Sequence, residues 1–250
     1  MTALQKDTLD LLVVTSLPWA TITSRDQFGI RFRAQPIRAS GEQTRPYDLS
    51  ITVERDGKVI VKEASQNRML PVSCPQRHIN DGGAFCIGLG ADVSVVDIPS
   101  AGAWWRTLEV FLTCQETADE SGSWPDTLQL SHGDAAEIQL AAEKLAERLG
   151  QKYLYELAVA YDEGPIAELC RQVSRITGRL RRKRELCACG YTRNGRVKNR
   201  QDCARDNNPC LPVLEARRRR EEARFWRQRE AKFVCCGTMK VCPLKSRTVD

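Results

Sequence analysis

The cysteines are unevenly distributed along this chain of 250 residues, and their distribution divides the chain into two unlike parts. Seven of the eleven cysteines lie in the last 64 residues. Charge follows the same division: residues 165–250 contain 23 Lys and Arg against 9 Asp and Glu, a net charge of +14, whereas residues 1–164 have a net charge of −8. A Gly164-Pro165 pair, which interrupts helices, lies at this point. We therefore expect two domains, residues 1–164 and residues 165–250.

The N-terminal region contains no signal for export or membrane insertion. Its longest apolar stretch, residues 11–14, is far too short for a signal peptide or a membrane span. Without export, a framework of disulfides is disfavoured. We therefore expect a cytoplasmic protein with no membrane partner, whose cysteines are free thiols, metal ligands or a nucleophile. The two histidines of the chain also exclude sites that need several, such as a three-histidine catalytic metal site.

The first part of the chain has the pattern of an antiparallel sheet. Residues 49–53 alternate apolar and polar side chains, Asp56-Gly57 supplies a tight turn, and the alternation resumes at residues 59–61. This is a strong hairpin signal. Residues 20–24 and 30–34 are two more short apolar runs. The pattern predicts a four-strand antiparallel meander.

Helices are predicted after a long irregular loop. Residues 69–100 are rich in Pro, Gly, Asn and Asp, and an irregular segment of this length in a compact domain is more often functional than not. Residues 103–115 and 135–155 then have apolar side chains at helical spacing; the second stripe is Ile138, Ala142, Leu145, Leu149 and Tyr153. The order of strands, loop and helices predicts an α+β domain.

Within this loop, a histidine, an asparagine and a cysteine lie close together in the sequence. Asn80 is two residues after His78, and Cys86 is eight residues after it. A cysteine thiolate is a good acyl-transfer nucleophile at neutral pH. An asparagine amide can donate a hydrogen bond to the oxyanion that forms when the resulting thioester is attacked. Gly82 and Gly83 allow a sharp turn that brings these groups to one point.

These residues carry a resemblance to a known family. The run His-Ile-Asn, followed by Gly-Gly-Ala-Phe-Cys86-Ile-Gly, resembles the active-site segment of ubiquitin-conjugating enzymes. In that family a His-Pro-Asn turn precedes a catalytic cysteine on an irregular flap, after a four-strand meander and before helices. The upstream Leu-Pro…Cys-Pro-Gln-Arg-His run and the Trp104-Trp105 pair resemble bacterial members, which occur in conjugation and antiphage operons. The resemblance covers about residues 15–160.

The resemblance implies a ubiquitin-conjugating-like fold and a transferase activity. Cys86 would form a thioester with the C-terminus of a ubiquitin-like modifier, or of another operon protein, received from an activating enzyme, and would pass the acyl group to an amine. His78 would organise the flap, and Asn80 would stabilise the oxyanion or order the loop. We expect no cofactor for this catalysis, and a role in antiphage defence. Asp92 or Asp97 could accept the proton of the amine.

The second part of the chain has the cysteine content of a zinc-binding domain. Zinc takes four soft ligands in a tetrahedron, and we expect it to have a structural role here. Four of the cysteines in this part would complete one site and would leave the last three one ligand short of a second. Alternatively, one site is built from the first pair and the last group, or all are free thiols. The expected ligands are Cys187, Cys189, Cys203, Cys210, Cys235, Cys236 and Cys242.

The same part contains a helix that is rich in arginine. Residues 212–233 have few apolar anchors, among them Leu214, Phe225 and Trp226. A net charge of +14 with interleaved aromatic residues is typical of a segment that binds an anionic partner. That partner is nucleic acid or an acidic protein surface, the chain's own acidic first domain included.

Two other functions are open from the sequence. In one, the conjugating-like domain is inactive, and the basic zinc-containing tail is a module that binds nucleic acid or protein. In the other, the chain is a Cys-His hydrolase, with His78 or His132 as general base for Cys86. Cys74 and Cys114 are expected to be inert buried thiols.

Overall fold

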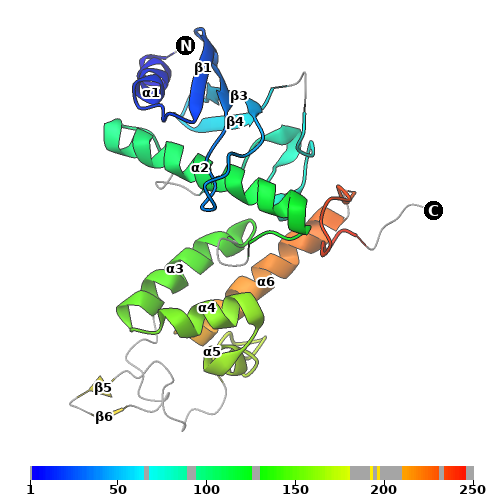
Figure 1. Cartoon of the computed structure of the whole chain (residues 1–250). Helices are drawn as coiled ribbons and strands as arrows, with labels where there is room; N and C mark the ends of the chain where they lie inside the picture. Colours follow the sequence, from blue (N-terminus) through cyan, green and yellow to red (C-terminus); the bar gives the residue numbers. More distant parts are fainter. Residues whose placement is uncertain are drawn as a thin grey trace. The chain divides into compact units, whose positions relative to one another are not determined.

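A computed structural model describes residues 2–64, 68–88, 94–125, 130–180, 192–193, 196–197, 210–230 and 234–245 (Figure 1). The chain forms two compact units. Unit 1 consists of Met1–Pro125 together with Val234–Asp250, and unit 2 is Asp126–Phe233. The end of the cysteine-rich part therefore belongs to the same unit as the predicted meander. The predicted domain boundary between residues 164 and 165 falls inside unit 2.

Unit 1 contains the four-strand antiparallel meander that the sequence predicts. The strands are β1 (Ala20–Arg25), β2 (Gly29–Ala34), β3 (Tyr47–Val53) and β4 (Val59–Glu63), and they pair in that order. Alternate side chains of β2 and β3 are buried, as the apolar alternation requires. The predicted α+β class and the four-strand antiparallel meander are thus confirmed.

Two helices cover the buried face of this sheet. Helix α1 (Ala3–Val14) begins with a capping box between Thr2 and Gln5. The longer helix α2 (Ile98–Ser121) supplies the centre of the core, where Trp104 and Trp105 are fully buried. The Trp105 indole N–H donates to the carbonyl of Leu12 at 2.9 Å, so this large side chain has its polar atom satisfied and links the two helices.

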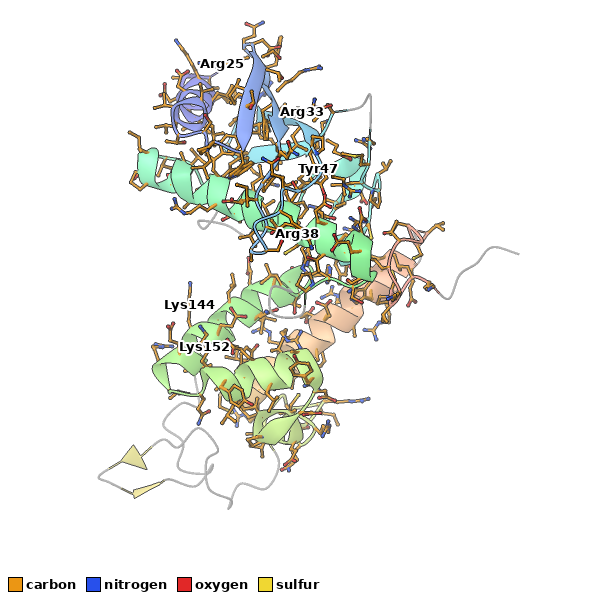
Figure 2. The ribbon with its side chains drawn as sticks, in the orientation of Figure 1. Arg25, Arg33, Arg38, Tyr47, Lys144 and Lys152 are labelled. Atoms are coloured by element: carbon orange, nitrogen blue, oxygen red, sulfur yellow. The ribbon has the colours of Figure 1, made fainter. Side chains whose placement is uncertain are left out.

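A polar contact also joins the sheet to the end of helix α2. Tyr47, labelled in Figure 2, is fully buried, and its hydroxyl donates to Glu116 at 2.5 Å. Burial raises the pKa of Tyr47 above the ordinary range for tyrosine, so the hydroxyl stays a donor at all physiological pH values. Arg38, also labelled, pairs with Glu120 on the same helix.

The loop after β4 is held against the sheet by hydrogen bonds from its backbone N–H groups to a side chain of β4. The buried carboxylate of Glu63 accepts hydrogen bonds from the backbone N–H groups of Met69 and Leu70, at 3.0 and 2.8 Å. Two short 3-10 turns follow, η1 (Pro75–Arg77) and η2 (Asp81–Gly83). We call residues 70–88 the flap.

Unit 2 is helical, and here one prediction was wrong. The sequence pattern predicted a single helix over residues 135–155, but two helices are present: α3 (Asp134–Arg148) and α4 (Lys152–Tyr161). Gly150 ends α3 with a φ of +64°, and the backbone N–H of Gln151 reaches back to the carbonyl of Ala146. The break changes the buried face, so Tyr153 is 72% exposed and Tyr155 is buried in its place.

Two more helices complete unit 2. Helix α5 (Gly164–Cys170) begins at the Gly-Pro pair, and α6 (Leu211–Glu230) is the predicted arginine-rich helix. Two strands of two residues, β5 (Thr192–Arg193) and β6 (Arg196–Val197), pair antiparallel. Within the described ranges, no helix combines the length and the apolar composition that crossing a membrane requires.

Candidate active site

Cys86 lies where the flap runs alongside the edge strand of the sheet. The backbone N–H of Phe85 donates to the carbonyl of Val61 in β4 at 2.9 Å, and Ala84 forms a bridge with Lys62. Phe85 is buried and stacks on Phe111 of helix α2 at 4.7 Å. The residue before the cysteine is thus anchored in the core, whereas Cys86 itself is half-buried.

The paired glycines make the turn that the sequence predicts. Gly82 and Gly83 have φ values of +76° and +82°, which side chains other than glycine rarely adopt. A Cβ atom on Gly83 would lie 2.8 Å from the guanidinium of Arg68, so that side chain would have to move. The turn is closed by a 2.7 Å hydrogen bond from the backbone N–H of Asn80 to the carbonyl of Ala84.

His78 supports Cys86 through its backbone. The N–H of Cys86 donates to the carbonyl of His78 at 2.7 Å. His78 itself has a left-handed φ of 54°, and its buried ring packs against Trp124 with centroids 5.0 Å apart. The contact between the two residues therefore positions the cysteine backbone, which agrees with the predicted organising role more than with that of a general base.

Asn80 lies on the solvent side of the same turn. Its side chain is exposed, and it is the N-cap residue that precedes η2. The flap thus brings the three predicted catalytic residues into one short hairpin. The oxyanion-stabilising role of Asn80 stays a prediction.

The charge state of Cys86 is set by burial and by one lysine. Burial raises the pKa of the Cys86 thiol above its ordinary value, because a thiolate is poorly solvated there. The positive charge of Lys58 and the backbone N–H of Gly88 act in the opposite direction. At neutral pH the thiol form dominates, and Lys58 is a nearby group that favours the thiolate.

Sequence reasoning did not identify the buried arginine that holds the flap to helix α2. Arg77 is 1% exposed; its Nε donates to the side chain of Gln115 at 2.8 Å, and its guanidinium also pairs with Asp119. The Gln115 amide in turn donates to the carbonyl of Arg77 at 2.8 Å. The only sequence signal for Arg77 is its position next to His78. Because an arginine is ordinarily solvated, this position alone does not predict a buried side chain.

Ile79 stands where the conjugating family has proline, and its backbone N–H has a partner. This N–H donates to the carbonyl of Cys74 at 3.0 Å, and the N–H of Cys74 donates back to the carbonyl of Ile79 at 2.9 Å. A proline could make only the second of these bonds. The substitution therefore adds a backbone link between Cys74 and the segment that leads to Cys86.

The predicted metal ligands are distributed over both units. Cys210 lies beside the start of α6 in unit 2, and Cys235, Cys236 and Cys242 lie in unit 1. In the part of the chain that the structure describes, no three ligating side chains are already spaced around one metal position. Cys187, Cys189 and Cys203 lie outside the described residues, so a zinc site that includes them stays a prediction.

The basic helix and the second histidine are engaged inside unit 2. Arg218 and Arg219 both pair with the fully buried Glu215. His132 pairs with Glu222 through Nδ1 at 2.7 Å, and its ring packs between aromatic side chains of α6. Part of the positive charge that suggested an anionic partner is thus neutralised within the unit.

The two predicted proton acceptors have different outcomes. Asp97 caps helix α2, and Asp92 lies outside the described residues.

Comparison with known families matches almost the whole chain. Residues 19–126 are similar to the family model described as "Prokaryotic E2 domain", and residues 131–244 to the one described as "Cysteine-rich domain, C-terminal to E2 domain". No curated protein and no solved structure matches the chain significantly. The first match contains the sheet, the flap and helix α2, and the second extends into the segment 234–245 of unit 1.

Proposed function

Because the chain belongs to the prokaryotic E2 family and carries its C-terminal cysteine-rich domain, we propose that Cys86 is the acyl carrier of a ubiquitin-like conjugation reaction. An E2-type conjugating role follows from the family, and the thioester on this cysteine is the finer step that we add. The observation that carries the proposal is the position of Cys86, half-buried on a flap whose preceding residue is bonded to the edge of the sheet.

The reaction consists of two acyl transfers. In the first, the Cys86 thiolate attacks the thioester carbonyl that joins the modifier to its activating enzyme, and the cysteine of that enzyme leaves as a thiolate. In the second, a neutral lysine amine attacks the new thioester, an amide forms, and the Cys86 thiolate leaves. The proton of the amine passes to a base or to water. No oxidant, reductant or metal is consumed in either step.

In this proposal three groups near Cys86 have a role: Lys58, His78 and Asn80. Lys58 favours the thiolate of Cys86 electrostatically, both as nucleophile and as leaving group. The carbonyl of His78 holds the cysteine backbone. The exposed amide of Asn80 is the donor that we propose for the oxyanion of the second transfer.

The test is a thioester assay with the purified full chain, ATP, and candidate activating enzymes and ubiquitin-like proteins from the same genome. We expect an adduct on a non-reducing gel that disappears on addition of thiol. The adduct should be absent in Cys86→Ala. It should remain in Cys114→Ala, the matched control, because Cys114 is a buried thiol of helix α2. Equal adduct in both variants, or its loss in both when circular dichroism shows that they are folded, would contradict the proposal.

We extend the proposal to antiphage defence by analogy with bacterial relatives of ubiquitin-conjugating enzymes. The expected result is that cells expressing the chain with its partner proteins form fewer phage plaques than cells expressing Cys86→Ala. Identical plaque counts, with the thioester adduct still formed in vitro, would leave the conjugation chemistry intact and reject the defence role.

A further inference from the structure

Four thiols from two distant parts of the sequence meet in unit 1. Cys74 in the flap is 2% exposed, and its Sγ lies 2.9 Å from the Sγ of Cys236. Cys235 and Cys242 are in side-chain contact with each other, and Cys242 interacts with both Cys74 and Cys236. We call these four residues the thiol cluster. The sequence left the last three cysteines one ligand short of a zinc site, and the structure places Cys74 beside them.

Backbone N–H groups near the sulfur atoms of the cluster favour negative charge on them. The N–H of Gly237 points at the Sγ of Cys235, at 3.4 Å. Backbone N–H groups near the other three sulfur atoms also act to lower the pKa of these thiols: Thr238 at Cys236, Leu244 at Cys242, and Arg77 at Cys74, where the N–H itself donates to the Cys74 carbonyl. Hydrogen bonds to an ionised acceptor are about twice as strong as neutral ones. A group of thiols close to backbone N–H groups is a site suited to thiolates.

We propose that the thiol cluster, Cys74 with Cys235, Cys236 and Cys242, binds one structural zinc ion. Zinc bound by four thiolates has Zn–S distances of about 2.3 Å, which puts neighbouring sulfur atoms about 3.8 Å apart. The Cys74–Cys236 separation of 2.9 Å is shorter than this, so the sulfur atoms must spread as the ion enters. Rotation about the Cα–Cβ bond of cysteine moves Sγ by more than that difference while the backbone stays in place.

The packing around the cluster holds its two halves together without the metal. Met239 and Leu244 are buried in the segment 234–245, and Cys236 and Cys242 pack against the core of unit 1. The N–H of Lys240 donates to the carbonyl of Gly122 at 2.7 Å, and Figure 1 shows this red segment beside the end of helix α2. The ligands are therefore brought near one another by the fold, which lowers the entropic cost of metal binding.

The metal would stiffen the flap close to the nucleophile. Cys74 is linked by two backbone hydrogen bonds to Ile79, the residue after His78, whose carbonyl holds Cys86. A zinc ion would thus join the end of the cysteine-rich domain to the base of the flap. This effect on Cys86 rests on the proposed function, whereas the zinc site itself does not.

The first test is the zinc content of the full chain, purified without added metal and measured by mass spectrometry. Cys242→Ser should lose about one zinc per chain relative to the unaltered protein, because a hydroxyl is a poor zinc ligand. Cys114→Ser is the control and should lose none, since Cys114 lies outside the cluster on helix α2. Equal zinc in Cys242→Ser and in the unaltered chain would overturn the proposal.

The second test uses the unaltered chain and does not depend on the folding of a variant. Alkylation with N-ethylmaleimide, mapped by peptide mass spectrometry, should leave all four cluster cysteines unmodified until a strong chelator is added, and then modify them together. Labelling before chelation would overturn the site. Cysteines that react only after a reductant would show disulfides in its place, and would also overturn it. Both readouts are independent of thioester formation.

Discussion

The guanidinium of Arg77 is an almost fully buried charge, and each of its three nitrogen atoms donates at least one hydrogen bond. It is bonded to Gln115 and Asp119 on helix α2, and its Nη1 lies 3.3 Å from the hydroxyl of Thr238 in the C-terminal segment. A buried charge with satisfied donors is costly to disturb, because a changed side chain leaves its partners unpaired. The side chain of Arg77 thus connects the flap to helix α2 and to the C-terminal segment of unit 1.

We expect Arg77→Lys to lower the free energy of unfolding by about 2 kcal/mol, since an ammonium cannot reproduce the planar set of donors. Urea denaturation of the full chain, followed by tryptophan fluorescence, measures this loss. Arg33→Lys is the matched control, because Arg33 is an exposed residue of β2 (Figure 2), and its cost should stay within about 0.5 kcal/mol. Equal stability of the two variants would show that the buried network contributes little.

The reactivity of Cys86 depends on the balance between burial and Lys58. Because burial raises the pKa of the thiol and the lysine lowers it, removing the lysine raises the pKa further and reduces the thiolate present at pH 7. Lys58→Met should therefore slow the alkylation of Cys86 at pH 7 by about two- to fivefold. The rate of the unaltered protein should rise with pH through the range above the ordinary thiol pKa.

Alkylation rates measured by mass spectrometry at several pH values test this prediction. Lys62→Met is the control: this lysine lies on β4 opposite Ala84, and its charge is not among those that act on Cys86. A faster reaction in Lys58→Met, or the same slowing in both variants, would be inconsistent with a specific effect of Lys58.

At the residue scale, sequence patterns predicted which cysteine is the candidate nucleophile. They did not predict the buried side chains that hold its flap in place. Cys86 could be identified because glycine, histidine and asparagine spacing is visible in the sequence. Cys74 was expected to be an inert buried thiol; it is buried, but its sulfur contacts Cys236, 162 positions away. A contact of this kind depends on how the chain returns to the flap, which local spacing does not encode.

The elements show a similar contrast between strands and helices. The hairpin of β3 and β4 was predictable because both its alternation and its Asp56-Gly57 turn are local, and Lys58 indeed donates its backbone N–H to Asp56 at 3.1 Å. Helix α1 was not predicted, since most of its apolar side chains are consecutive in residues 11–14 and do not recur at helical spacing along its length. The division between α3 and α4 was missed because the apolar spacing continues through Leu149 to Tyr153, and only Gly150 between them signals an end.

Gly150 allows a test of that division. Its φ of +64° is unfavourable for alanine, and nothing lies within 4 Å of an added Cβ, so Gly150→Ala should cost about 1 kcal/mol through backbone strain alone. Gly102 is the opposite case, inside helix α2 with its nearest contact at an ordinary 3.5 Å. Gly102→Ala should stabilise the chain by about 0.5–1 kcal/mol.

Thermal or urea unfolding of both variants measures these two free energies. The changes in the free energy of unfolding should have opposite signs, because the same methyl group is added to a left-handed position in Gly150→Ala and to a right-handed helix in Gly102→Ala. If Gly150→Ala were also stabilising, the chain would have to form the single helix over residues 135–155 that the sequence pattern predicted.

At the scale of the whole molecule, the chain leaves unit 1 and returns to it. Sequence composition separated residues 1–164 from 165–250, because charge and cysteine content change there. The compact units follow packing instead, and the last described residues, 234–245, contribute buried side chains to the core of unit 1. Composition could not predict this return, since it depends on where individual side chains of a short segment pack, Met239 and Leu244 among them, and not on the residue content of the tail.

The return of the chain predicts where a tail substitution will act. Met239 is 2% exposed and packs in the core of unit 1, so Met239→Ala should cost about 2–4 kcal/mol. Val241, two residues away and 77% exposed, is the control, and Val241→Ala should cost less than about 0.5 kcal/mol. Because cooperative units lose protection together, amide hydrogen exchange should quicken in the sheet and the flap.

The amides of α3 and α6 in unit 2 should keep their protection in Met239→Ala, since the lost side chain is not part of their core. Mass spectrometry of peptides from the exchanged protein resolves these regions separately. If the tail belonged with residues 165–250, as composition alone indicates, the loss would instead appear in α5 and α6, with the flap unchanged. Faster exchange in the flap would mean that the end of the cysteine-rich domain stabilises the segment that carries Cys86, so that substitutions near the C-terminus can alter the proposed thioester chemistry without touching the nucleophile.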